Sequence, residues 1–128
     1  MKKVSIDTIS MIRPSHKEIH NKISEAKEAA ARRKIAIVEP MSFAADALEL
    51  DYPVESISEI LHILLDEITP EYYAGRRPPQ RSYESCIQGA DLFAFQWKSS
   101  VVHSEIYFKF ALKEGCLWLV SLHKSRKK

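Results

Sequence analysis

The chain has little of what would place it outside the cell or in a membrane. Its 128 residues include two cysteines, Cys86 and Cys116, which have neither the spacing of a metal site nor the density of a secreted disulfide scaffold. No apolar run approaches the roughly 18 residues that a membrane span requires. Lysines, an aspartate and an arginine interrupt the first residues, so they lack the apolar centre of a signal peptide. We therefore expect a cytoplasmic protein without membrane association, metal or other cofactor.

Glycine is also scarce, with three in the chain, and the absence of low-complexity tracts argues against extensive disorder. Hydrophobic residues make up 45% of the chain, so 128 residues suffice to bury the core of one domain. Composition and patterning divide this single domain, 1–128, into a lead-in at 1–14, a mostly helical part at 15–70, a basic loop at 71–90, a β-meander at 91–124 and a basic tail at 125–128.

Charge is distributed unevenly between the two halves of the chain. Residues 1–70 hold nine lysines and arginines against twelve acidic residues, a balance of −3. Residues 71–128 hold ten against five, a balance of +5, of which the last three residues supply three charges. This asymmetry favours a face that contacts a polyanion, although a solubilising tail explains more than half of the excess.

Two Ser-Xaa-Xaa-Glu capping boxes predict helix starts in the first half of the chain. Ser15 and Glu18 begin a helix that runs to about residue 33, and Ser56 and Glu59 begin another that ends before Pro70. A brief helix lies between them, starting near residue 41. Residues 34–38 fit a short strand or an extended linker, and 1–12 fit either a strand or an irregular lead-in.

In the last third of the chain, apolar and polar residues alternate in the way that is typical of the strands of a β-hairpin. Apolar residues at 106, 108, 110 and 112 point one way, while Tyr107 and Lys109 point the other. A turn at Glu114–Gly115 leads to a final strand that ends near His123. With a first meander strand at 92–97, the pattern predicts an α+β fold with N-terminal helices packed on a small antiparallel sheet and a C-terminal β-meander.

Between the helices and the meander, residues 71–90 read as a loop because two adjacent prolines and a glycine fall within them. Arg76, Arg77 and Arg81 lie in this loop and are candidate phosphate contacts, as is Lys124 at the end of the last strand. An ordinary solvated loop explains the arginines about equally well. Trp97, near the loop, is more typical of a core residue than of a platform for stacking a base.

Two stretches, EIYFKFALKEGCLWLVSLHK and ALELDYPVESISEILHILLDEITPEYY, resemble the MqsR branch of the RelE-like ribonuclease toxins. The first is similar to that family's closing hairpin with its Tyr-Xaa-Lys strand, and the second to its middle segment, in which a helix leads to an aromatic pair. The resemblance implies a metal-independent endoribonuclease, an mRNA interferase of a bacterial type II toxin–antitoxin system. It also implies mRNA as substrate, a co-encoded antitoxin as partner and possible association with the ribosome.

Position by position, the resemblance places the family's strand tyrosine at Tyr107, with Lys109 two residues later, and its last-strand lysine at His123. A histidine there can act as general acid or base, because it titrates near neutrality. We therefore predict proton transfer by Tyr107 and His123 and neutralisation of phosphate charge by Lys109 and the loop arginines. The chain departs from the family at Ala74 and Ala90, where a lysine and a glutamine are expected.

Two other classes of function remain open on the sequence. The domain is either a non-catalytic RNA-binding module, which the two departures favour, or a protein-interaction module that pairs through an exposed sheet edge. Loss of Tyr107 and His123 separates these from a nuclease, because only a nuclease would lose turnover.

Overall fold

The computed structural model describes residues 13–51 and 56–125. The open question about 1–12 and most of the basic tail fall outside these residues. Three helices precede the meander, α2 (His16–Ala31), α3 (Pro40–Leu50) and α4 (Ile57–Glu67), and a short strand, β1 (Ile35–Ile37), follows α2. Two 3-10 turns, η2 (Pro70–Tyr72) and η3 (Ser85–Ile87), lie in the predicted loop, and β2 (Phe93–Ser99), β3 (Ser104–Lys113) and β4 (Cys116–Lys124) form the meander.

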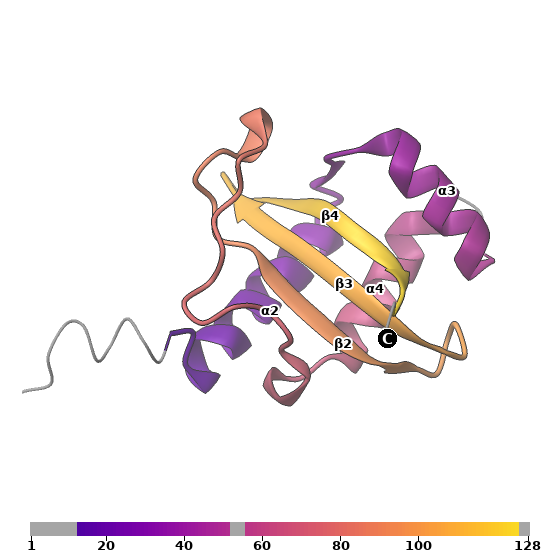
Figure 1. Ribbon diagram of the computed structural model, residues 1–128, viewed down its shortest axis with the longest axis horizontal. Coiled ribbons are helices and arrows are strands. Elements are labelled where there is room, and N and C mark those ends of the chain that lie inside the picture. Colours follow the sequence, from indigo (N-terminus) through magenta and orange to yellow (C-terminus); the bar gives the residue numbers. More distant parts are fainter. Residues whose placement is uncertain (1–12, 52–55, 126–128) are drawn as a thin grey trace, which may run out of the picture.

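The four strands form one sheet in the order β1-β4-β3-β2, with α2 and α4 behind it and α3 beside β4 (Figure 1). The prediction of an α+β fold with a C-terminal meander is confirmed. The prediction of an antiparallel sheet is wrong in one respect, because β1 pairs with β4 in parallel, Ile35 opposite Leu117. The connection from β1 to β4 contains α3, α4 and the rest of the meander, so a parallel arrangement costs no tight turn.

The two capping boxes have different outcomes. The side chain of Ser15 accepts a hydrogen bond from the backbone N–H of Glu18, so the start of α2 is confirmed. The carboxylate of Glu18 binds the guanidinium of Arg13. Ser56 stands at the N-cap of α4, but its side chain caps no backbone N–H, so the second capping box is not formed.

The main core lies between the helices and one face of the sheet. In α2 and α4 the buried residues recur at helical spacing, and in β2 and β3 every second residue is buried against them. The fully buried members include Ile19, Leu61, Leu64, Phe95 and Phe108. Burial of large apolar side chains of this kind stabilises the fold by about 1.5–3 kcal/mol each.

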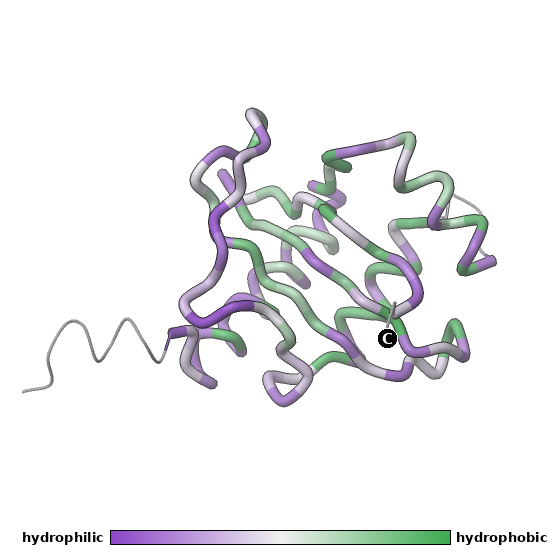
Figure 2. The backbone as a smooth tube through the Cα atoms, in the orientation of Figure 1, coloured by the Kyte–Doolittle hydropathy of each residue, from purple (hydrophilic) through white to green (hydrophobic). Residues whose placement is uncertain are grey.

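The other face of the sheet is covered at one end only. Ile87 and Leu92, from the loop and its junction with β2, are buried against Ala111 in a second, smaller cluster. Trp118 and Val120 pack on this cluster from β4. The loop itself follows the β2 side of the molecule and is largely hydrophilic, in contrast to the mostly apolar strands beside it (Figure 2). The remaining part of this face bears polar side chains.

Candidate functional site

The uncovered part of the sheet brings together side chains from three strands. We call it the open face and define it by Gln96 of β2, Tyr107 and Lys109 of β3, and Ser121 and His123 of β4, all partly exposed. Tyr107 lies between Gln96 and His123 in the ladder, and Lys109 lies opposite Ser121. The structure therefore places the three predicted catalytic residues on one face.

Tyr107 and His123 form a stacked pair. They are direct cross-strand partners, and their ring centroids are 5.3 Å apart with an angle of 21° between the planes. Aromatic rings at such a separation attract each other, which holds both side chains in a defined orientation. The sequence predicted that both residues lie on the hairpin; their stacking follows from the register.

A β-bulge puts His123 on this face. The register of β3 and β4 shifts between Lys109 and Phe110, so that Phe110 faces Leu119 while Lys109 faces Ser121. The intervening Val120 is the extra residue of the bulge. Strict alternation from the buried Leu119 would have turned His123 toward the helices, because a shift of one residue exchanges the two faces of a strand.

The histidine is held in one tautomer when it is neutral. Its Nδ1 lies 2.7 Å from the backbone oxygen of Lys124, and a carbonyl oxygen can only accept, so Nδ1 carries the proton and donates it. The lone pair is then on Nε2. A neutral imidazole in this state presents a proton acceptor at Nε2, and after protonation it presents a donor at the same atom.

Tyr107 is the complementary group. Its side chain is about half buried between its neighbours, and this burial raises the pKa of its phenol. A phenol of raised pKa keeps its proton at neutral pH and acts as a hydrogen-bond or proton donor. The ammonium of Lys109 lies 5.9 Å from the centre of the Tyr107 ring, so a positive charge accompanies the pair.

Two polar residues of the open face were missed by sequence reasoning. Ser121 lies opposite Lys109, and the amide nitrogen of Gln96 donates to Glu105 at 3.2 Å. Alternation along β2 would have found Gln96, since it lies between the apolar residues 95 and 97. Ser121 has no comparable signal, because its face depends on the bulge.

The basic loop, residues 71–90, begins beside the open face. The backbone N–H of Ala74 donates to the oxygen of Ala94 at 2.8 Å, and Ala94 is the cross-strand partner of Lys109. Ala74 is therefore about 10 Å, two strand spacings, from Lys109. The exposed Ala74 stands where the resembled family has a lysine, so that cation is missing at this edge.

The first turn of the loop is fixed by Tyr73. Its hydroxyl donates to the backbone oxygen of Arg76 at 2.6 Å, and burial raises the pKa of Tyr73 to about 12. Gly75 leaves the space that this contact needs, since a Cβ there would lie 2.6 Å from the Tyr73 hydroxyl. The guanidinium of Arg77 lies 4.9 Å from the centre of the Tyr73 ring and donates to the backbone oxygen of Pro14. Arg77 thus anchors the loop.

The returning arm of the loop is anchored by a charged network. Arg81 lies 3.8 Å from Asp91, and Arg13 binds both Asp91 at 3.1 Å and the carboxylate of Glu18. The backbone oxygen of Gln80 accepts from the N–H of residue 92. These contacts tie the loop to the start of α2 and to the start of β2.

Between the two arms the loop encloses a hollow of about 550 Å³, which we call the basic hollow. It is lined by Arg76, Arg77, Pro78, Pro79, Gln80, Arg81 and Tyr83. Three of these side chains are cationic and none is acidic. The structure thus gathers the predicted phosphate contacts of the loop in one concave surface, separate from the open face.

Two candidates lie elsewhere. Lys124 is the partner of the buried Ile106, so alternation places it on the opposite side of the sheet from His123. Trp97 is 5% exposed and donates from its indole nitrogen to Glu67 at 2.8 Å. The prediction that Trp97 is a core residue is confirmed, and a stacking role is excluded by its burial.

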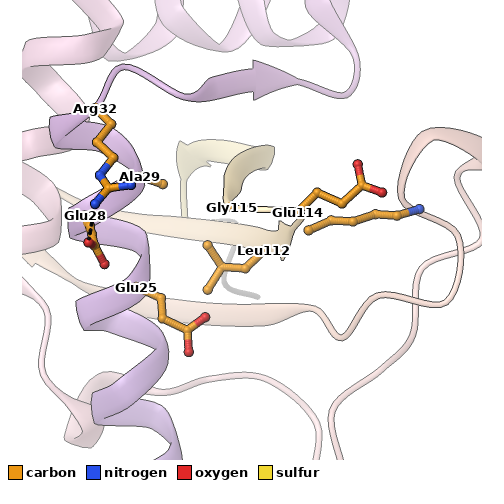
Figure 3. Close-up of a pocket in the computed structure, with 8 residues that line it drawn as sticks. Glu25, Glu28, Ala29, Arg32, Leu112, Glu114 and Gly115 are labelled. Atoms are coloured by element: carbon orange, nitrogen blue, oxygen red, sulfur yellow. Dashed lines mark hydrogen bonds and ion pairs between the residues drawn. The ribbon is translucent and has the colours of Figure 1, made fainter.

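A second hollow, of about 220 Å³, lies between α2 and the turn after β3 (Figure 3). Its lining includes the carboxylates of Glu25, Glu28 and Glu114 and the cations of Arg32 and Lys113, and Arg32 is paired with Glu28 at 3.0 Å. Charges of both signs therefore meet in this hollow, so it lacks the excess of positive charge that the basic hollow has.

Within residues 13–51 and 56–125, no three His, Cys, Asp or Glu side chains are grouped as metal ligands. None of the helices in these ranges has the length and apolar character needed to cross a bilayer. The chain matches no model of a known protein family and no curated protein.

Proposed function

We propose that this chain is an mRNA-cleaving toxin of a type II toxin–antitoxin system, a metal-independent endoribonuclease whose open face holds the scissile phosphate. The observation that carries the proposal is the stacked pair of Tyr107 and His123, beside Lys109. Transesterification of RNA is promoted by a proton acceptor, a proton donor and a cation near the phosphate, and an imidazole, a phenol and an ammonium can fill these three roles.

The reaction uses the 2′-hydroxyl of the RNA as nucleophile. Nε2 of His123 accepts the proton of this hydroxyl while its oxygen attacks the adjacent phosphorus, and the bond from phosphorus to the 5′-oxygen breaks. Tyr107 donates its proton to that leaving oxygen. The products are a 2′,3′-cyclic phosphate and a 5′-hydroxyl, and the imidazolium returns its proton through solvent to the phenolate.

Lys109 and the position of the pair on a rigid sheet support this chemistry. The ammonium neutralises part of the charge that develops on the phosphate oxygens, and strands hold reacting groups more firmly than loops do. As a toxin, the protein would be restrained by a co-encoded antitoxin and act in the cytoplasm, on free mRNA or at the ribosome.

Binding of RNA without cleavage is the second candidate, and one observation favours it. Ala74 is exposed beside the open face, and Ala90 packs into the apolar cluster around Ile87. These are the positions at which the resembled family has a lysine and a glutamine. If those groups are essential, the surface retains affinity and lacks turnover.

Growth of a bacterial host on induced expression tests the proposal. The parent chain is expected to arrest growth and fragment mRNA, and a Tyr107→Phe, His123→Gln double variant at equal soluble level is expected to do neither. The control is His20→Gln, because this histidine is exposed on α2, across the molecule from the open face. Normal growth with the soluble parent contradicts the toxin, and arrest by all three proteins contradicts the site.

A further inference from the structure

The basic hollow combines positive charge with flat apolar surface. Pro78 and Pro79 form part of its wall, the amide of Gln80 can donate and accept, and the ring of Tyr83 stands at its rim. A volume of about 550 Å³ is within the range of small-ligand sites. A ligand that matches this lining has a planar face, hydrogen-bonding edges and negative charge.

Tyr83 is the unusual member of the hollow. Its side chain is 89% exposed, and it makes no hydrogen bond or ring contact with the described residues. The backbone beneath it is nevertheless fixed, since the buried Ser82 accepts from the N–H of Glu84 at 3.0 Å and donates its own N–H to the oxygen of Ala90. An exposed ring on an anchored backbone is a ready platform for stacking.

The guanidinium groups of the hollow are only partly neutralised. Arg76 is exposed and forms no ion pair with the residues that the structure describes. Arg81 is 74% exposed and lies 3.8 Å from Asp91, a carboxylate that Arg13 also binds. A positive field therefore remains at the hollow, and it attracts an anion such as a phosphate.

We infer that the basic hollow binds one unpaired nucleotide of single-stranded RNA, with the base stacked on Tyr83 and the phosphate held by Arg76 and Arg81. This inference rests on the proposed function for the identity of the polymer. Gln96, beside Tyr107, and Asp91, beside Arg81, are about 17 Å apart along an extended chain. The hollow thus engages a nucleotide away from the scissile phosphate and sets the position of the strand.

An abasic scan tests the inference in the full-length chain. The background is His123→Gln, so that RNA is bound without being cut. Affinity is measured by fluorescence anisotropy for an eight-nucleotide RNA in which one base at a time is removed. We expect one position to lower the affinity about fivefold or more, as loss of one base–aromatic stack does.

The same scan is then repeated with Tyr83→Leu added, a change at an exposed position that removes the ring. We expect the intact RNA to bind about as weakly as the critical abasic RNA bound before, and the scan to become flat. Arg32→Ala, which removes a guanidinium at the C-terminal end of α2, away from the loop, is the control and should leave the scan unchanged.

Retention of full affinity and an unchanged scan in Tyr83→Leu would overturn the inference, as would equal binding of a duplex of the same sequence. Cleavage by the unaltered chain is assayed in parallel. If the unaltered chain cleaves RNA but the scan is flat, the nucleotide site is contradicted and the proposed nuclease activity stands. If the scan depends on position but no RNA is cleaved, the nucleotide site stands and the nuclease activity is contradicted.

Discussion

The two faces of the sheet differ although the same strands build them. Toward the helices, β3 contributes Phe108 and Phe110, both fully buried in the main core. On the other face the same strand contributes Tyr107 and Lys109, which are partly exposed and paired with β4. Alternation thus places core side chains and partly exposed polar side chains at successive positions along one strand. Substitutions on the open face should change RNA cleavage, and substitutions on the helix face should change folding.

The largest expected effect is on turnover. Replacing His123 by Gln removes the proton acceptor and keeps a side chain of similar size, so the rate of RNA cleavage should fall about 10²- to 10⁴-fold. The free energy of unfolding should fall by no more than about 0.5–1.5 kcal/mol, because the ring stack with Tyr107 is lost. Single-turnover cleavage and urea unfolding measure the two quantities. A loss of both together would contradict the separation of the faces.

The opposite result, a loss of stability without a loss of cleavage, is expected for a substitution on the helix face of the sheet. Phe108→Ala leaves a cavity in the main core and should lower the free energy of unfolding by about 3–5 kcal/mol. Any protein that remains folded should cleave RNA at nearly the parent rate, once activity is normalised to the folded fraction. Tyr107→Ala, at the adjacent position, is the matched comparison and should cost far less stability. Equal destabilisation by the two variants would show that the open face is part of the core.

The positions of Phe108 and Tyr107 on opposite faces could be predicted from the sequence. The alternation around residues 106–112 predicted the two faces of β3 correctly. Apolar and polar residues alternate over several successive positions there, and each position supports the same assignment of faces. The face of His123 was beyond such reasoning, since the bulge at Val120 has no sequence signal of its own. The parallel pairing of β1 was missed for a related reason. A strand of three residues has too few side chains to specify its partner in the sheet.

A smaller effect concerns acid stability. The hydrogen bonds from Arg13 lower the pKa of Glu18 below its usual 4.5 in the folded chain. A carboxyl group whose pKa is lower in the folded than in the unfolded chain stabilises the fold at any pH above its unfolded pKa. This contribution to the free energy of unfolding is lost as the pH falls through and below about 4.5. Glu18→Gln should therefore be less stable than the parent near pH 7 and approach it toward pH 3.

Urea midpoints across this pH range measure the difference, and the exposed Glu84, as Glu84→Gln, is the control. A constant gap between parent and Glu18→Gln from pH 7 to pH 3 would contradict the assignment to Glu18. Because Arg13 also binds Asp91, this ion pair connects the start of α2 to the arm of the loop that carries Arg81.

The smallest expected effect is electrostatic. Lys109→Met keeps the length of the side chain and removes one positive charge from the open face. Affinity for single-stranded RNA should fall a few-fold at low salt, and the slope of log affinity against log salt should decrease by about 0.7, the value for one phosphate contact on a single strand. Lys17→Met, on the exposed side of α2, should leave both quantities unchanged. An unaltered slope for Lys109→Met would place the phosphate elsewhere.

The central claim is that Tyr107 and His123 activate the RNA's own 2′-hydroxyl. Its most direct test is cleavage of an RNA by the purified chain in a chelating buffer, beside the same RNA with a single 2′-deoxy nucleotide at the cut site. The account predicts a 2′,3′-cyclic phosphate from the first RNA, no cut at that position in the second, and loss of cleavage in His123→Gln but not in His20→Gln. Absence of cleavage by the parent, or equal cleavage by His123→Gln, would contradict it.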